Sequence, residues 1–197
     1  MIYDYEKKVI QVKVVYYGLA MSGKTTSLKY LFSYFEKQEM LESIDNSIGR
    51  TLFFDFGILN FQDADWSTKI LLFAASGQDF YSSTRPVTLY GVDGLIFVVD
   101  SRLEYIQHNL RSWNEIKTVL GDQIYEIPII ISFNKYDLVK DFNFEKNKFL
   151  QAIELSRFSN ISITKTIALK GIGVVEAFQD LIDFIFPQKV LSKEEAV

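Results

Sequence analysis

The chain has 197 residues, of which 48% are hydrophobic and 15% aromatic. This is enough to bury one well-packed core and too little for two domains of ordinary size, so we expect one domain spanning 1–197, with a core over 9–187 and a short polar tail over 188–197. The formal net charge of −4 argues against a nucleic-acid partner, and the lack of cysteine together with a single histidine excludes disulfides, thiolate zinc sites and His-based metal clusters.

Targeting and anchoring signals are missing from the sequence. No signal-peptide pattern opens it, no apolar run is long enough to span a membrane, and neither end carries a lipidation motif. We therefore expect a cytoplasmic protein without a lipid anchor or a transmembrane segment.

The first predicted unit is a strand, a glycine-rich loop and a helix. Residues 9–17 are β-branched and aromatic, which indicates a strand, and apolar residues recur at helical spacing over 26–35. Between them, residues 18–25 match the phosphate-binding pattern G-x-x-x-x-G-K-[ST]. A glycine turn that merely precedes a helix is the alternative, and the flanking elements favour the phosphate site.

This loop predicts a nucleoside triphosphate site. Two glycines allow backbone N–H groups to converge on one point, and the helix N-terminus adds its positive dipole end. Lys24 can reach the β- and γ-phosphates, and the Thr25 hydroxyl can ligate Mg²⁺. The residues expected to contact the nucleotide here are Gly18, Ala20, Met21, Ser22, Gly23, Lys24, Thr25 and Thr26.

The remaining elements alternate along the chain. After a loop over 38–49 we expect an antiparallel hairpin of strands 51–56 and 68–74 with a turn over 60–64, a second loop over 77–84, and a short helix near Pro86. Three more strands are predicted over 94–100, 128–133 and 161–166, and three helices over 104–120, 144–155 and 174–186. Together they predict an α/β fold: a six-stranded, mainly parallel sheet with one antiparallel edge strand and helices on both faces.

Two stretches at predicted strand ends point to guanine. Asn134, Lys135 and Asp137 form the pattern N-K-x-D, and the Asp137 carboxylate can accept hydrogen bonds from the N1–H and the 2-amino group of guanine, a donor pair that adenine lacks. Ala168 and Leu169, after the last strand, can offer a backbone N–H to guanine O6. These features disfavour an ATP-dependent kinase.

At this point the chain resembles the small Ras-like GTPases, which share the P-loop G-domain fold, and within them the bacterial and archaeal MglA group. The resemblance runs from about residue 12 to residue 186. It is carried by the strings Tyr16-Tyr17-Gly18, Gly23-Lys24-Thr25-Thr26, Arg50-Thr51-Leu52-Phe53-Phe54-Asp55-Phe56, Gly77-Gln78-Asp79-Phe80-Tyr81, Gly91-Val92-Asp93-Gly94 and Asn134-Lys135-Tyr136-Asp137.

The resemblance implies further site residues. Thr51 looks like the switch I threonine that joins Mg²⁺ and senses the γ-phosphate, and Gly77 like the switch II glycine whose N–H meets that phosphate. Gln78 looks like the residue that orients the attacking water, and Arg50 like an arginine supplied within the chain. The implied catalytic set is Arg50, Gln78, Lys24 and Thr51. The alternative for Arg50 is a solvated loop residue at the start of the strand, without a catalytic role.

One position departs from the Ras-like pattern. The switch II motif D-x-x-G is replaced by Ala74-Ala75-Ser76-Gly77, so the aspartate that supports Mg²⁺ through a water is missing. Asp55, on the neighbouring strand, is the nearest substitute. A purely structural carboxylate is the alternative.

The resemblance implies a molecular switch that binds GTP and GDP with Mg²⁺ and hydrolyses GTP slowly. It also implies a Roadblock-fold homodimer of the MglB type as activator, and effectors that contact the switch loops. The alternative is a guanine-nucleotide-binding scaffold with negligible hydrolysis, which the missing aspartate supports.

Overall fold

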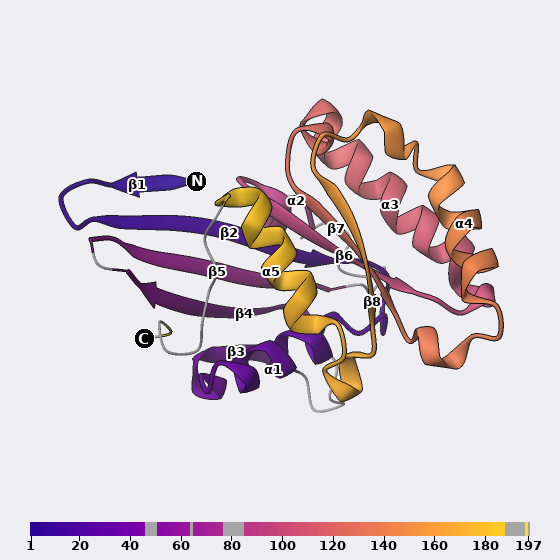
Figure 1. The fold of residues 1–197 in the computed structure, drawn as a ribbon, viewed down its shortest axis with the longest axis horizontal. Helices are drawn as coiled ribbons and strands as arrows, with labels where there is room; N and C mark the ends of the chain where they lie inside the picture. Colours follow the sequence, from indigo (N-terminus) through magenta and orange to yellow (C-terminus); the bar gives the residue numbers. More distant parts are fainter. Residues whose placement is uncertain (46–50, 64, 77–84, 188–195, 197) are drawn as a thin grey trace.

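The computed structural model describes residues 1–45, 51–63, 65–76, 85–187 and 196 (Figure 1). Within them one sheet runs through the molecule in the order β3-β4-β5-β2-β6-β7-β8, with β1 paired to the outer part of β2. The strands are β1 (Ile2–Asp4), β2 (Val9–Tyr17), β3 (Leu41–Asp45), β4 (Thr51–Gln62), β5 (Ser67–Ala75), β6 (Gly94–Asp100), β7 (Ile129–Asn134) and β8 (Ile161–Thr166).

Helices cover both faces of this sheet. The α-helices are α1 (Lys24–Tyr34), α2 (Arg85–Leu89), α3 (Ile106–Leu120), α4 (Phe142–Ala152) and α5 (Val174–Ile185). The 3₁₀ helices are η1 (Gln38–Met40), η3 (Leu103–Tyr105), η4 (Gly121–Tyr125), η5 (Tyr136–Leu138), η6 (Leu155–Arg157) and η7 (Ala168–Lys170). Helices α1 and α5 lie over one face, and α2, α3 and α4 over the other (Figure 1). The predicted α/β class is confirmed.

The centre of the sheet is parallel and buried on both sides. Strand β2 pairs in parallel with β5 and β6, and the parallel order continues through β7 to β8. Every residue of β6 and β7 is buried, which is the reason that both segments are continuous apolar runs in the sequence. Alternate residues of β2 serve the two cores: Val14 and Tyr16 pack toward α1 and α5, and Val15 and Tyr17 toward α3.

The predicted number of six strands is wrong. Over the described residues the sheet has eight strands, and the two that the prediction lacks are β1 and β3. Strand β3 lies inside the predicted loop 38–49, and its sequence Leu-Glu-Ser-Ile-Asp has no continuous apolar run. It forms by antiparallel pairing to β4, so the open edge of a neighbouring strand fixes it rather than its own propensity.

The predicted antiparallel hairpin is confirmed as β4 and β5, but its edges shift. Strand β4 continues through the predicted turn 60–64 as far as Gln62, and the reversal falls between Gln62 and Ser67. Because β3 adds to its outer side, β4 is an inner strand. Asp55 is therefore flanked on both sides and completely buried.

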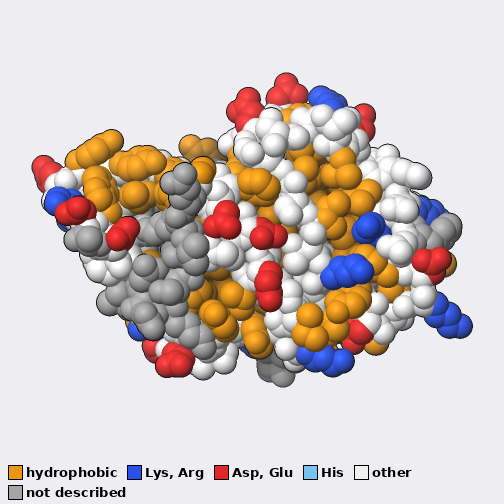
Figure 2. All heavy atoms as spheres, in the orientation of Figure 1, with side chains coloured by type: hydrophobic (Ala, Val, Ile, Leu, Met, Phe, Trp, Pro, Cys, Tyr) orange, Lys and Arg blue, Asp and Glu red, His pale blue; other side chains and the backbone are white. Residues whose placement is uncertain are grey.

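The end of the sheet that carries β1 exposes apolar side chains. Figure 2 shows hydrophobic atoms gathered there, at the left of the view, and Met1, Ile2, Tyr3 and Tyr5 are all more than 40% exposed. The Tyr5 ring packs edge-on against Trp66, at 5.7 Å between ring centroids, so these rings shield one another in part from water. Among the helices that the structure describes, none has the length and apolar character needed to cross a membrane.

Candidate nucleotide-binding site

The glycine-rich loop joins the end of β2 to the start of α1, at the carboxyl edge of the parallel strands. Gly18 has φ +141°, and a Cβ atom there would lie 2.3 Å from the Val98 carbonyl oxygen. Gly23 has φ +113°, and a Cβ atom there would lie 2.1 Å from Nδ2 of Asn134. Both positions therefore require glycine for backbone conformation and for close packing. Helix α1 begins at the next residue, so its N-terminus faces the loop.

Lys24 lies within the loop rather than out in solvent. Its side chain is 6% exposed, and Nζ donates to the carbonyl oxygens of Gly18 at 2.9 Å and Leu19 at 2.7 Å. Burial lowers the pKa of the Lys24 amine to about 7; the charge on Arg85 acts in the same direction and that on Asp55 opposes it. An anion beside the amine favours its charged form, which suits this lysine to a phosphate ligand.

Thr25 and Asp55 meet across the site. Thr25 Oγ1 donates to Oδ2 of Asp55 at 2.5 Å, and Asp55 is 0% exposed. In the antiparallel pairing of β4 with β5, Asp55 lies directly opposite Ala74. The carboxylate of Asp55 therefore starts from the strand position next to the one where the Ras-like pattern has its aspartate.

This pair fits a magnesium ion that is shared with a bound nucleotide. Mg²⁺ prefers oxygen ligands and usually combines one or two protein oxygens with phosphates and waters. Thr25 and Asp55 supply a hydroxyl and a carboxylate in contact with each other. Among the described residues there is no group of three or more His, Cys, Asp or Glu side chains that would form an all-protein metal cage.

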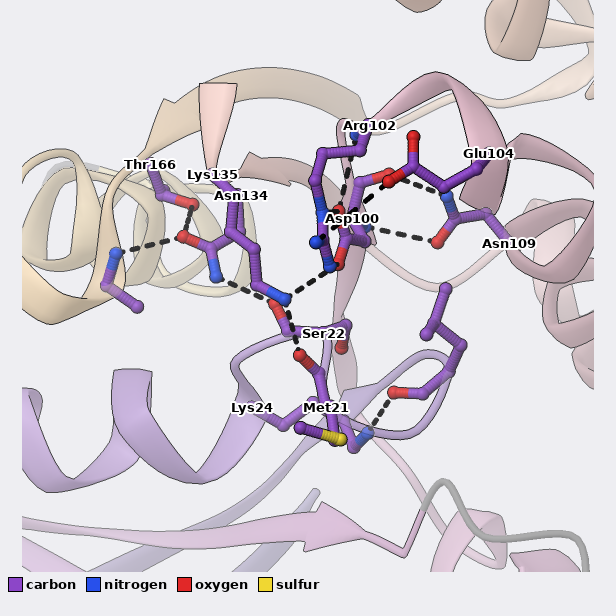
Figure 3. A network of polar contacts seen from close by, with 12 residues as sticks. Met21, Ser22, Lys24, Asp100, Arg102, Glu104, Asn109, Asn134, Lys135 and Thr166 are labelled. Carbon is purple, nitrogen blue, oxygen red and sulfur yellow. Dashed lines mark hydrogen bonds and ion pairs between the residues drawn. The ribbon is translucent and has the colours of Figure 1, made fainter. Parts of the chain in front are cut away.

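Asn134 ties the N-K-x-D loop (residues 134–137), which is predicted to recognise the base, to the glycine-rich loop (residues 18–25), called the phosphate loop below. The side chain is 2% exposed, and Nδ2 donates to the Ser22 carbonyl at 2.7 Å (Figure 3). Its Oδ1 accepts the Ala168 N–H at 2.9 Å and the Thr166 hydroxyl at 3.4 Å. The Ala168 N–H thus already donates within the chain, and the next residue, Leu169, is 89% exposed.

Asp137 and Lys135 extend from the same loop. The Asp137 side chain is 29% exposed, and Oδ2 lies 3.5 Å from Nζ of Lys170, at the end of η7. Lys135 has a left-handed backbone with φ +62°, and its Nζ donates to the Met21 carbonyl at 2.7 Å. The structure thus brings the phosphate loop, the N-K-x-D loop and the loop after β8 together at one edge of the sheet.

Several predicted residues are not placed in this way. Arg50, Gly77 and Gln78 lie outside the described residues, and Thr51 is described only as the first residue of β4, with its backbone paired to Asp45. Ala20 lies in the glycine-rich loop and Thr26 in the first turn of α1, so their predicted contacts with a nucleotide stay predictions.

Two charged residues near the site were not predicted from the sequence. Asp100 ends β6 and is 1% exposed, and Arg85 begins α2 and is 5% exposed. The signal for Asp100 is a carboxylate that closes a continuous apolar strand at its carboxyl end, where ligands of such sheets bind. Arg85 has no comparable signal, because its burial depends on the packing of α2 against α3.

Comparison with known proteins agrees with this geometry. The family model described as the ADP-ribosylation factor family matches residues 2–185. The chain is 31% identical over 191 residues to the mutual gliding-motility protein MglA of Myxococcus xanthus (strain DK1622), covering 94% of this chain and 95% of that protein. It is also 32% identical to ADP-ribosylation factor-like protein 6 of Caenorhabditis elegans and 30% identical to that of Caenorhabditis briggsae, in each case covering 86% of this chain and 84% of the relative. The predicted resemblance to the MglA group is confirmed, and the chain belongs to the ADP-ribosylation factor family of small GTPases.

Proposed function

We propose that this chain is a cytoplasmic guanine-nucleotide switch, a single G domain that binds GTP and GDP with Mg²⁺ and hydrolyses GTP slowly. The observation that carries this proposal is the hydrogen bond from Asn134 to the Ser22 carbonyl, which joins the predicted base loop to the phosphate loop. Membership of a small GTPase family supports the same conclusion.

The phosphate side of the proposed complex rests on the loop and the start of α1. Lys24, held near the loop carbonyls, would turn to the β- and γ-phosphates, and the backbone N–H groups after Gly18 would surround them. Thr25 would ligate Mg²⁺ through its hydroxyl. The ion would neutralise phosphate charge when the nucleotide is bound.

The base side rests on Asp137. We expect Asp137→Asn to weaken GTP binding by about 100-fold, because a charged acceptor of two hydrogen bonds becomes a neutral amide with one acceptor oxygen. The variant should favour xanthine nucleotides, since an amide can donate to a 2-oxo group. Competition against a fluorescent guanine nucleotide measures both effects, with Asp122→Asn, an exposed aspartate of η4, as the matched control. Equal competition by GDP and ADP in the wild-type protein would show that the base assignment is wrong.

Asp55 is proposed to replace the missing switch II aspartate and to support Mg²⁺ through a water. Its contact with Thr25 and its position opposite Ala74 support this role. We expect Asp55→Asn to raise by about 10-fold the Mg²⁺ concentration needed to retain GTP, because a neutral amide attracts the hydrated ion less strongly. GTP retention is measured across a Mg²⁺ titration.

A second substitution separates this role from a structural one. Ala74→Asp in the Asp55→Asn background restores a carboxylate from the paired strand position. It should therefore lower the Mg²⁺ concentration needed to retain GTP part of the way back to the wild-type value. Unchanged Mg²⁺ dependence in Asp55→Asn would instead assign Asp55 to holding Thr25 alone.

The partner and the catalytic set come from the similarity to MglA. We propose that Arg50 and Gln78 act within this chain, with Lys24 and Thr51 binding the phosphates and Mg²⁺, and that a Roadblock-fold homodimer accelerates hydrolysis. A second candidate function is a guanine-nucleotide-binding scaffold with negligible hydrolysis. The observation that supports it is the missing carboxylate at Ala74. A single-turnover GTPase assay with and without that activator distinguishes them, because a scaffold stays inactive in both.

A further inference from the structure

A buried carboxylate beside the nucleotide-binding loops is shared by two cations. Asp100 is 1% exposed, and its Oδ2 accepts hydrogen bonds from Nζ of Lys135 at 2.7 Å and from Nη2 of Arg102 at 2.8 Å (Figure 3). Its Oδ1 accepts from Nε of Arg102 at 3.0 Å. Burial by itself raises the pKa of the Asp100 carboxyl, but the hydrogen bonds from Arg102 and Lys135 more than offset it and hold that pKa below its ordinary value.

The backbone of Asp100 is fixed from two sides. The Asp100 N–H donates to Oδ1 of Asn109 at 3.1 Å, and Nδ2 of Asn109 donates to the Asp100 carbonyl at 2.8 Å. Asn109 is fully buried in α3. On the other side Asp100 pairs in register with Asn134 of β7, and the Ser101 N–H donates to the Asn134 carbonyl. The carboxylate therefore has a defined position relative to the N-K-x-D loop.

Lys135 connects this carboxylate to the phosphate loop. One ammonium group donates at 2.7 Å to Asp100 Oδ2 and at 2.7 Å to the carbonyl of Met21. Met21 lies in the phosphate loop and has a left-handed backbone, φ +61°. Without a negative partner, an ammonium that is only 24% exposed would lose part of its solvation and gain only one carbonyl in return. Asp100 thus supplies the charge that keeps Lys135 against Met21.

We propose that Asp100 is a positioning residue for nucleotide retention: it holds Lys135 so that the base-recognition loop and the phosphate loop stay joined around a bound guanine nucleotide. Arg102 donates further hydrogen bonds to both oxygens of the Asp100 carboxylate. This inference rests on the proposed function. It concerns how long the nucleotide stays bound, and it leaves base choice to Asp137 and hydrolysis to other residues.

The test is the dissociation rate of fluorescent GDP from the full chain in excess Mg²⁺. Asp100→Asn should speed dissociation by about 10-fold, because the ion pair with Lys135 becomes a weaker hydrogen bond from the ammonium to a neutral amide oxygen. Arg102→Ala is the control, since it removes the second cation and leaves the Lys135–Asp100 contact, and it should change the rate by less than about 3-fold. Preference for guanine over adenine nucleotides should be the same in Asp100→Asn and wild type.

A double-mutant cycle separates positioning from general destabilisation. In a Lys135→Met background, Asp100→Asn should have no further effect on GDP dissociation, because the residue through which it acts is absent. If Asp100→Asn does not fold, Asn109→Ala takes its place, since it keeps the carboxylate but loosens its backbone, and it should speed dissociation only when Lys135 is present.

Two results would overturn the inference alone: wild-type GDP dissociation in the Asp100→Asn protein, or an equal acceleration with and without Lys135. Failure of the wild-type chain to bind any guanine nucleotide would overturn the proposed function as well, so the two failures are distinguishable.

Discussion

Replacing Arg50 by alanine is expected to lower activator-stimulated GTP hydrolysis by about 10³-fold or more while GTP still binds. Charge builds up around the β–γ bridge in phosphoryl transfer, and an arginine placed there typically raises the rate by ~10³–10⁵-fold, which is about 4–7 kcal/mol of transition-state stabilisation. Arg50 directly precedes Thr51, the first residue of β4, and the same strand carries Asp55 to its contact with Thr25. If Arg50 acts at the phosphates as proposed, the activator needs no arginine of its own.

The measurement is a single-turnover assay with a saturating Roadblock-fold activator. Gln78→Leu should show a comparable loss, and Arg111→Ala, at an exposed position of α3, serves as the matched control and should hydrolyse GTP at the wild-type rate. Substitution of each activator arginine should leave stimulation largely intact. An activator arginine whose loss abolishes hydrolysis, with Arg50→Ala still active, would contradict the assignment.

Replacing Glu115 by alanine is expected to lower the free energy of unfolding by about 3 kcal/mol. Nη1 of Arg85 lies 2.5 Å from Oε2 of Glu115, and the Arg85 side chain is only 6% exposed. Removing the carboxylate takes this anion away from a buried guanidinium, and breaking a buried ion pair from one side typically costs about 3–5 kcal/mol. We take the lower end of that range because the Glu115 side chain is 27% exposed.

Urea denaturation of the nucleotide-loaded protein measures this change. Glu104→Ala is the matched control, since Glu104 is 64% exposed and lies 4.0 Å from Arg102, and it should cost less than about 0.5 kcal/mol. Nε of Arg85 also donates to the Ser76 carbonyl at 3.0 Å, so the ion pair supports the contact between the start of α2 and the end of β5. An unchanged denaturation midpoint in Glu115→Ala would show that the pair contributes nothing to stability.

The sequence alone determined the features that depend on local chemistry. The pattern of Gly18, Gly23 and Lys24 predicted a glycine-dependent loop between a strand and a helix, and both glycines have a positive φ in the structure. The apolar runs at β6 and β7 identified the buried parallel strands, because a strand covered on both faces cannot alternate apolar with polar residues. The N-K-x-D pattern likewise appears at the carboxyl end of β7, where it was predicted.

Tertiary structure alone decided which distant residues meet. Strand β3 exists because β4 offers an open edge, although residues 41–45 show no strong strand pattern. The register of β4 on β5 sets Asp55 opposite Ala74, and a shift of one residue would turn it away from Thr25. Contacts such as Lys135 with Asp100 and Arg85 with Glu115 likewise depend on how strands and helices pack, which local propensity and motif spacing do not encode.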